Sequence, residues 1–130
     1  MYIDADVIYA HIKSTDWLKL YADKIISLKN LQTSIISITE LEIVSKRDFQ
    51  DDFYNNVLEK IKKIKNLTII NLDIPILEKA IELRKKYNLG IFDSIHIATA
   101  IILKEKVIIS SDSAFDNLAE IKREDPRMYK

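Results

Sequence analysis

Four acidic residues stand at the margins of segments that are otherwise apolar. They are Asp4, Glu40, Asp93 and Asp112. A carboxylate at the margin of a buried segment costs free energy unless something neutralises it. The four residues lie too far apart in the chain to help one another locally, so only tertiary folding can bring them together. If it does, four negative charges share one pocket, and their natural counter-charge is a hard divalent cation, which prefers oxygen ligands.

The composition indicates a single domain and excludes several classes of binding site. The 130 residues fit one domain, predicted to span 1–130, and 48% hydrophobic residues are enough for a substantial core. Lys plus Arg and Asp plus Glu are equal at 20 each, so no overall basic charge indicates a nucleic-acid binder. The absence of cysteine excludes disulfides and thiolate zinc sites. The two histidines, His11 and His96, are too few for a histidine-based metal cluster.

The chain carries no pattern typical of export or membrane insertion. Its N-terminus lacks a charged region followed by an apolar one, so we predict no signal peptide. No apolar run reaches the ~18 residues that suggest a membrane span. We therefore expect a cytoplasmic protein without a membrane partner.

Hydrophobic periodicity predicts strands that alternate with helices. The expected strands are a β-rich run at the start of Tyr2–Ile8, then Leu31–Ile36, Leu67–Leu72, Val107–Ile109 and an edge strand at Ile121–Arg123. The expected helices are Trp17–Leu28, one from a cap at Ser37 or Thr39 to about Lys46, Phe53–Ile64, one from a cap at Asp73 to about Tyr87, Phe92–Leu103, and a short one at Ser113–Leu118. Apolar strands separated by helices indicate an α/β fold of three layers, with a central parallel sheet of four to five strands and helices on both faces.

In a parallel sheet, ligands bind beyond the carboxyl ends of the strands. Asp4 lies at the end of the first expected strand, and Asp112 lies just after the fourth. Asp93 and Glu40 fall in the first turns of helices, so all four acids can converge on one rim. Each also has a structural interpretation: Asp93 or Asp112 could cap a helix, and Glu40 could pair with Ser37 in a capping box. Asp4 is expected to have no such role, because it lies inside a strand.

Four stretches of the chain together resemble one known family. They are Tyr2–Ile8, Ser34–Leu41, Phe92–Ala100 and Ser110–Phe115. The third, with Asp-x-x-His-x-Ala-x-Ala on a helix, is the most specific, and the fourth is similar to Thr-x-Asp-x-x-Phe with serine in place of threonine. In this order and at these separations they resemble the PIN-domain nucleases, and within them the VapC-type toxins of prokaryotic toxin–antitoxin pairs. The resemblance covers essentially the whole chain.

The resemblance implies an endoribonuclease that depends on Mg²⁺ or Mn²⁺. The acids of the family map onto four catalytic and metal-binding positions, Asp4, Glu40, Asp93 and Asp112. Such a metal site makes the attacking water more acidic and stabilises a charged transition state, and the expected products carry a 5′-phosphate and a 3′-hydroxyl. The resemblance also implies an RNA substrate, a cognate antitoxin that inhibits the enzyme, and a homodimer.

Several residues near these motifs have roles that the sequence leaves open. After the first acid the family usually has a small hydroxyl or amide residue, whereas this chain has Ala5 and Asp6. Asp6 could be an outer-sphere metal ligand or cap the following helix, and Asp116 could be a further acid on the rim or a solvated residue. Ser110 could hold a metal-bound water or simply end its strand. We expect His96 to pack or hydrogen-bond beside the site.

Three other functions compete with the metal-dependent nuclease. A PIN-fold module could bind RNA or a protein without cleaving, although retention of all four acids favours a nuclease. A phosphatase with an Asp-x-Asp nucleophile is suggested by Asp4-Ala5-Asp6, but the chain is short for such an enzyme with a substrate cap. A ribonuclease that uses two histidines as acid and base would require His11 and His96 to meet.

Overall fold

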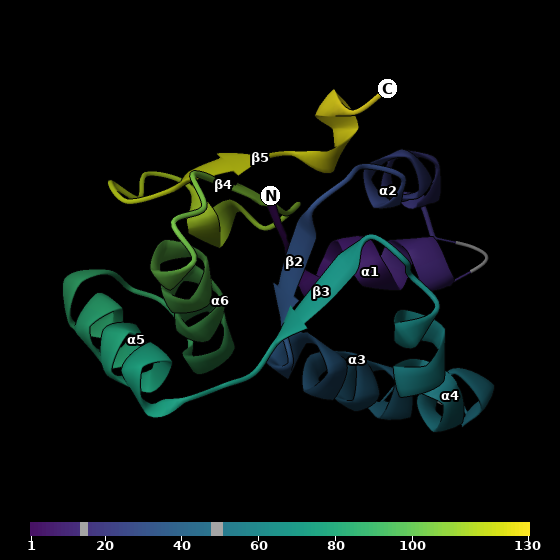
Figure 1. Ribbon diagram of the computed structural model, residues 1–130, viewed down its shortest axis with the longest axis horizontal. Coiled ribbons are helices and arrows are strands. Elements are labelled where there is room, and N and C mark those ends of the chain that lie inside the picture. The colour runs from purple at the N-terminus through teal and green to yellow at the C-terminus, as the bar shows by residue number, and fades with distance from the viewer. Residues whose placement is uncertain (14–15, 48–50) are drawn as a thin grey trace.

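Five short strands hydrogen-bond into one sheet in the computed structural model, which describes residues 1–13, 16–47 and 51–130 (Figure 1). The strands are β1 (Tyr2–Ile3), β2 (Leu31–Ser34), β3 (Leu67–Ile70), β4 (Val107–Ile109) and β5 (Lys122–Glu124). Their spatial order is β3–β2–β1–β4–β5, and every neighbouring pair is parallel. Because parallel neighbours need crossover connections, helices lie between most of the strands in sequence.

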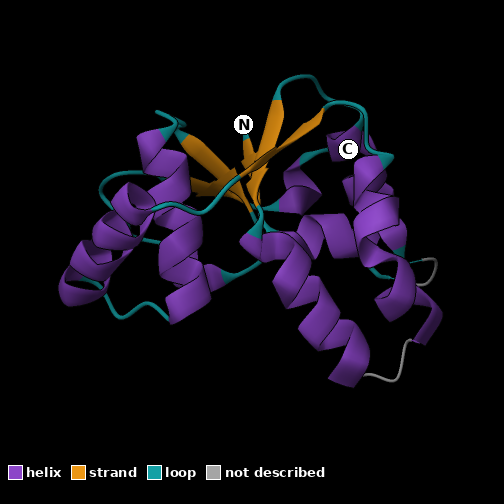
Figure 2. Cartoon of the chain, turned by 60° about the horizontal axis from the view of Figure 1, so that its bottom comes forward, coloured by secondary structure: helices purple, strands orange, loops and turns teal. Residues whose placement is uncertain are grey.

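Helices cover both faces of this sheet (Figure 2). They are α1 (Ala5–Ile12), α2 (Lys19–Ile26), α3 (Ile36–Arg47), α4 (Asp51–Lys62), α5 (Ile74–Lys86) and α6 (Ile91–Ile102), with 3₁₀ helices η1 (Ser113–Phe115) and η2 (Pro126–Met128). In Figure 1, α5 and α6 lie on one side of the strands and α1, α3 and α4 lie on the other. The predicted three-layer α/β fold is therefore confirmed. Within the described part of the chain, no helix is both long and apolar enough to cross a membrane.

Successive residues of the inner strands face two different cores, because side chains alternate in direction along a strand. Tyr2 and Ile108 pack in the core on the side of α5 and α6. Ile3 and Ile109 pack in the core that α1 to α4 complete. All four side chains are fully buried. Burial on both faces explains why β1 and β4 read as continuous apolar runs rather than as alternating ones.

The first apolar segment is mostly helix, which corrects the sequence prediction. β1 ends at Ile3 and α1 begins at Ala5, so the strand stops before Asp4, and Asp6 lies in a helix rather than at the end of a strand. Asp4 is the N-cap of α1, because its carboxylate accepts a hydrogen bond from the Ala5 N–H at 2.8 Å. The expectation that Asp4 has no capping role is therefore wrong, since a cap residue needs only the extended backbone that Asp4 has here.

Two neighbouring elements also differ from the prediction. α3 begins at Ile36, where the Ser34 hydroxyl accepts from the Ile36 N–H at 3.1 Å. The predicted caps, Ser37 and Thr39, therefore lie inside the helix. The apolar, β-branched run Leu67–Leu72 predicts a buried strand. β3 is instead an edge strand with an exposed Thr68, because the sheet continues on only one side of it.

The helix expected at Phe53–Ile64 has an amphipathic sequence, which predicts one apolar face formed by Phe53, Val57, Leu58, Ile61 and Ile64. In α4, Val57 and Ile61 are buried, whereas Leu58 is 44% exposed. Phe53 lies outside the described side chains.

The later elements agree more closely with the sequence. Asp73 caps α5 as predicted and accepts from the Ile76 N–H at 3.0 Å. α6 lies within one residue of the predicted helix and is buried from Ser94 to Ala100. β4 coincides with its prediction, η1 is shorter than expected, and β5 lies at the edge of the sheet one residue later than expected.

Candidate functional site

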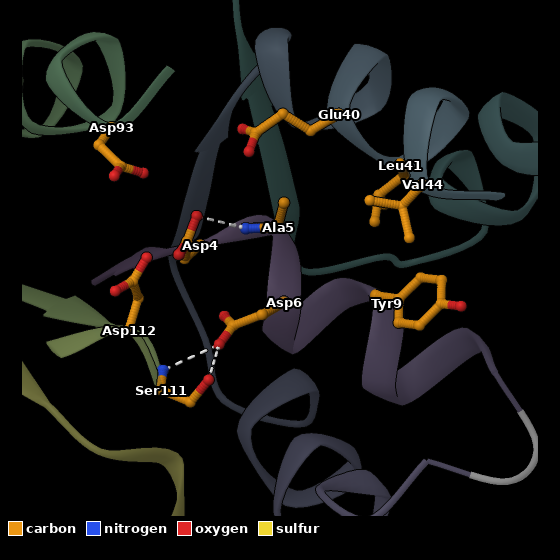
Figure 3. Close-up of a pocket in the computed structure, with 10 residues that line it drawn as sticks. All are labelled: Asp4, Ala5, Asp6, Tyr9, Glu40, Leu41, Val44, Asp93, Ser111 and Asp112. Atoms are coloured by element: carbon orange, nitrogen blue, oxygen red, sulfur yellow. Dashed lines mark hydrogen bonds between the residues drawn. The ribbon is translucent and has the colours of Figure 1, made fainter. Parts of the chain in front are cut away.

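A pocket of about 440 Å³ opens at the carboxyl edge of the sheet. It is lined by Asp4, Ala5, Asp6, Tyr9, Glu40, Leu41, Val44, Asp93, Ser111 and Asp112. Figure 3 shows four carboxyl groups turned toward one shared space, those of Asp4, Glu40, Asp93 and Asp112. Folding therefore gathers the four acids that the sequence pattern singled out, and Asp6 joins them in the pocket.

The topology of the sheet explains this convergence. Asp4 directly follows β1, Asp112 lies three residues after β4, and Glu40 lies in the helix that follows β2. β1 is paired with both of the other strands, and parallel strands end at the same edge of a sheet. Asp93 approaches from the first turn of α6, which covers one face of that sheet.

Asp4 is the most buried of these acids, with 7% of the residue exposed. One carboxylate oxygen accepts from the Ala5 N–H, and the other accepts from the Ser110 hydroxyl at 2.7 Å. Ser110 in turn accepts from the Asp112 N–H at 3.0 Å, so one serine connects two acids. Burial raises the pKa of the Asp4 carboxyl group, while His96 and the Ser110 hydrogen bond oppose that rise.

Asp6 enters the pocket from the first turn of α1. Its Oδ2 accepts hydrogen bonds from both the backbone N–H, at 2.8 Å, and the hydroxyl of Ser111. Its Oδ1 is buried and has no hydrogen-bond partner in the part of the chain that the structure describes. Burial, followed by the negative charge of Asp4, raises the pKa of Asp6 to about 7. Asp6 is thus not the cap of α1, and its unpartnered oxygen is available to a cation.

Asp93 and Asp112 have different structural roles. Asp93 lies in the first turn of α6, where the helix dipole favours an anion, but the N-cap of that helix is Gly90. Burial, and then the charge of the neighbouring Asp112, raise the pKa of Asp93. Asp112 does cap η1, accepting from the Ala114 N–H at 2.9 Å, and its side chain also lines the pocket. The capping interpretation therefore holds for Asp112 without removing it from the site.

Glu40 is held by a buried histidine. His96 lies in α6, its Nε2 hydrogen-bonds to Glu40 Oε1, and its Nδ1 lies 2.6 Å from the Tyr2 hydroxyl oxygen. Nε2 also lies 3.5 Å from Asp4 Oδ1. His96 thus hydrogen-bonds to an acid that lines the pocket, and its role in a functional site stays a prediction. The capping-box interpretation of Glu40 is wrong, because Ser37 lies inside α3.

This set of donors fits a hard divalent cation. One ligand atom from each of Asp4, Glu40 and His96 lies within 4.8 Å of the other two. Burial away from solvent and repulsion between neighbouring carboxylates raise the pKa values of Asp4, Asp6 and Asp93. A cation would offset both effects, because it supplies the opposite charge and a partner for the free oxygen of Asp6.

Two candidates from the sequence lie elsewhere. Asp116 is not among the residues that line the pocket, and its carboxylate pairs with the Arg123 guanidinium at 2.7 Å beside a second cavity. His11 hydrogen-bonds with Asp23 at 2.7 Å, whereas His96 is fully buried among other partners. The two histidines therefore do not form the acid–base pair that a histidine ribonuclease requires.

Sequence reasoning placed Ser110 and His96 near the site but missed two further residues that hold its groups in place, Ser111 and Tyr2. Ser111 stands beside a predicted acid and could have been found from that position alone. Tyr2 lies two residues before Asp4, so the period of a strand could have suggested a shared direction. The pocket also has an apolar wall, formed by Tyr9, Leu41 and Val44. This wall requires α1 to pack beside α3, which hydrophobic periodicity does not show.

The match to a family model decides the relationship of this chain to known proteins. Residues 1–121 match the model of the PIN domain. The chain belongs to the PIN-domain family. This confirms the resemblance seen in the four sequence stretches. No curated protein matches the sequence.

Solved structures of toxin–antitoxin proteins share the fold of this PIN domain. A toxin–antitoxin complex from Klebsiella pneumoniae is 20% identical over 96% of each chain, with a TM-score of 0.69. DNA-bound VapBC from Salmonella typhimurium is 16% identical over 96% of each chain, with a TM-score of 0.75. VapC20 from Mycobacterium tuberculosis, a toxin that cleaves the sarcin–ricin loop, is 14% identical over 89% of each chain, with a TM-score of 0.68. At these identities the likeness establishes the fold.

Proposed function

We propose that this PIN domain is a metal-dependent endoribonuclease and the toxin of a VapBC-type toxin–antitoxin pair. The observation that carries the proposal is a single pocket lined by the acids Asp4, Glu40, Asp93 and Asp112. None of the described residues that line it is basic. Such a pocket repels a phosphodiester until a cation is present, and it offers the oxygen ligands that Mg²⁺ and Mn²⁺ prefer.

The residues of the pocket have different proposed roles in binding the cation. The cation would be held, directly or through waters, by Asp4, Glu40, Asp93 and Asp112, with Asp6 in an outer-sphere position. When bound, it would supply a more acidic attacking water and positive charge at the phosphate. Ser110 and Ser111 orient Asp4 and Asp6 through their hydrogen bonds. The apolar wall beside the acids lowers the local dielectric constant, which strengthens electrostatic interactions in the pocket.

The proposed partners are RNA, a cognate antitoxin and a second copy of the chain. The Klebsiella pneumoniae structure is a toxin–antitoxin complex, and the Salmonella typhimurium structure holds VapBC on DNA. VapC20 is a toxin that cleaves the sarcin–ricin loop, which supports RNA as the substrate class. These relationships support the proposal through a shared fold and family.

A cleavage assay with matched variants tests the nuclease. The wild-type protein should cut RNA with Mn²⁺ or Mg²⁺, should stop with EDTA, and should leave 5′-phosphate ends. Asp4→Asn and Asp93→Asn should each lower the rate by about 100-fold or more, because each removes a charge that would hold the cation. Asp116→Asn is the control, because Asp116 lies outside the pocket and pairs with Arg123. It should retain activity.

Other results would point to other functions. RNA binding without cleavage under any metal condition would favour the non-catalytic PIN-fold module. Hydrolysis of a small phosphomonoester, with RNA left intact, would favour the phosphatase. Cleavage that persists in both pocket variants would remove the acids from the mechanism.

A further inference from the structure

We infer that Tyr2 and His96 form a buried hydrogen-bonded chain that positions Glu40 and keeps the His96 imidazole from becoming a metal ligand. The inference rests on one part of the proposed function, namely that the acidic pocket takes a cation. It concerns the residues behind the pocket, and it assigns His96 a positioning role although its Nε2 lies close enough to the acids to be a ligand.

The chain lies in the core of the protein. Tyr2 and His96 are each 0% exposed, and their rings meet edge to face with centroids 5.8 Å apart. Tyr2 belongs to the central strand β1, and His96 lies in the middle of the buried helix α6. Because both side chains are fully buried in a close-packed core, neither has room to change its direction.

Hydrogen bonds determine which nitrogen of His96 carries a hydrogen. The Tyr2 hydroxyl oxygen already accepts from the Ser34 N–H at 3.0 Å. An ordinary phenol loses its hydrogen only near pH ~10, so the Tyr2 hydroxyl carries its hydrogen at neutral pH. The hydroxyl hydrogen then has His96 Nδ1, 2.6 Å away, as its acceptor. A neutral imidazole that accepts at Nδ1 carries its hydrogen on Nε2.

The hydrogen on Nε2 points to Glu40. Glu40 Oε1 is the hydrogen-bond partner of Nε2, and an ionised carboxylate can only accept. If the imidazole is instead doubly protonated, Nε2 still carries a hydrogen. In both forms Nε2 has no lone pair for an ion, so His96 donates to Glu40 and fixes the direction of that carboxylate.

This arrangement affects which metals the pocket prefers. Imidazole nitrogen suits Zn²⁺, Ni²⁺ and Cu²⁺, whereas carboxylate oxygen suits Mg²⁺ and Mn²⁺. Because the Tyr2–His96 chain keeps a hydrogen on Nε2, the cluster of Asp4, Glu40 and His96 offers an ion only the carboxylate oxygens of Asp4 and Glu40. The pocket thereby favours hard cations.

The first test is spectroscopic and needs no substrate. Nitrogen NMR of the metal-free protein should show a hydrogen on Nε2 of His96, and that hydrogen should remain when Mg²⁺ is added. The chain has only two histidines, and His11 serves as the internal reference because it bonds Asp23 away from the pocket. A hydrogen on Nδ1 alone, or loss of the Nε2 hydrogen on adding Mg²⁺, would overturn the inference.

The second test measures Mn²⁺ affinity by calorimetry on folded variants. His96→Leu should weaken binding about 10- to 100-fold, because Glu40 loses its donor. His96→Gln should recover most of the affinity, because the Gln amide can donate to Glu40. Tyr2→Phe should give a smaller loss. Tyr87→Phe is the control, since the Tyr87 hydroxyl bonds Glu120 elsewhere.

The two tests separate this inference from the proposed function. If His96→Leu folds and binds Mn²⁺ as tightly as the wild type, the positioning role is wrong even when RNA is cleaved. If the NMR and affinity results are as expected but no RNA is cleaved, the nuclease proposal fails and the assignment of Tyr2 and His96 stands.

Discussion

At the scale of single residues, Ser110 shows how small polar side chains organise this pocket. It is fully buried at the end of β4. Its hydroxyl donates to Asp4 and accepts from the Asp112 N–H, so one group sets the positions of two acids from distant parts of the chain. A hydroxyl can do this because it is both donor and acceptor.

Ser110→Ala should therefore affect both metal binding and folding. We expect Mn²⁺ affinity to fall about 10-fold or more, because Asp4 loses a neighbour that orients it. We also expect the free energy of unfolding to fall by about 1–3 kcal/mol, because a buried acceptor is left unpaired. Calorimetry and urea unfolding measure the two effects. Ser27→Ala, at an exposed serine that bonds only locally, is the control, and equal Mn²⁺ affinity in both variants would contradict the role of Ser110.

At the scale of elements, Arg123 connects β5 and η2 to Ser110, which lies beside the acidic pocket. Arg123 in β5 donates to the Ser110 carbonyl oxygen at 3.0 Å and pairs with Asp116. It also lies 3.4 Å from Asp125, the N-cap of η2. Asp125 in turn pairs with Arg127 at 2.7 Å. The segment that begins at β5 is therefore held by charge as well as by sheet pairing.

The Asp125 interactions should make stability depend on pH. Hydrogen bonds from Arg127 hold the pKa of Asp125 below its usual 3.8. A lowered pKa in the folded state stabilises the protein above that usual value, and the contribution is lost as the pH falls below it. Asp125→Asn should lower the free energy of unfolding by about 1 kcal/mol at neutral pH. The difference should shrink as the pH falls below about 4. Urea unfolding across this range measures it, and a difference that does not vary with pH would refute the electrostatic origin.

At the scale of the whole molecule, charge is balanced in number but not in position. Basic and acidic residues are equal at 20 each, yet the pocket at the carboxyl edge of the sheet is lined by Asp4, Asp6, Glu40, Asp93 and Asp112. Repulsion among these acids opposes folding in the absence of a cation. Without a cation, the folded protein is therefore destabilised by its acids at the position where the ion is proposed to bind.

Divalent cations should therefore stabilise the folded protein. At a concentration of Mn²⁺ 100 times its Kd, the gain should be about 2.7 kcal/mol, which raises the Tm by several degrees. EDTA should reverse the shift, and NaCl at equal ionic strength should not reproduce it. Differential scanning calorimetry of the wild type and of Asp4→Asn measures the effect. An equal rise in both proteins would show that Mn²⁺ binds elsewhere.

The amino-acid sequence determined the layered α/β fold, the later helices and the identity of the four acids. Those features follow from local patterns: the periodicity of α6, the Asp73 cap, and acids placed beside apolar segments. The tertiary structure decided what each acid contacts. Asp4 caps α1 only because β1 ends after Ile3, and Glu40 meets His96 only because α3 packs near α6. Partners 56 residues apart leave no local trace in sequence, because only packing brings them within hydrogen-bonding distance.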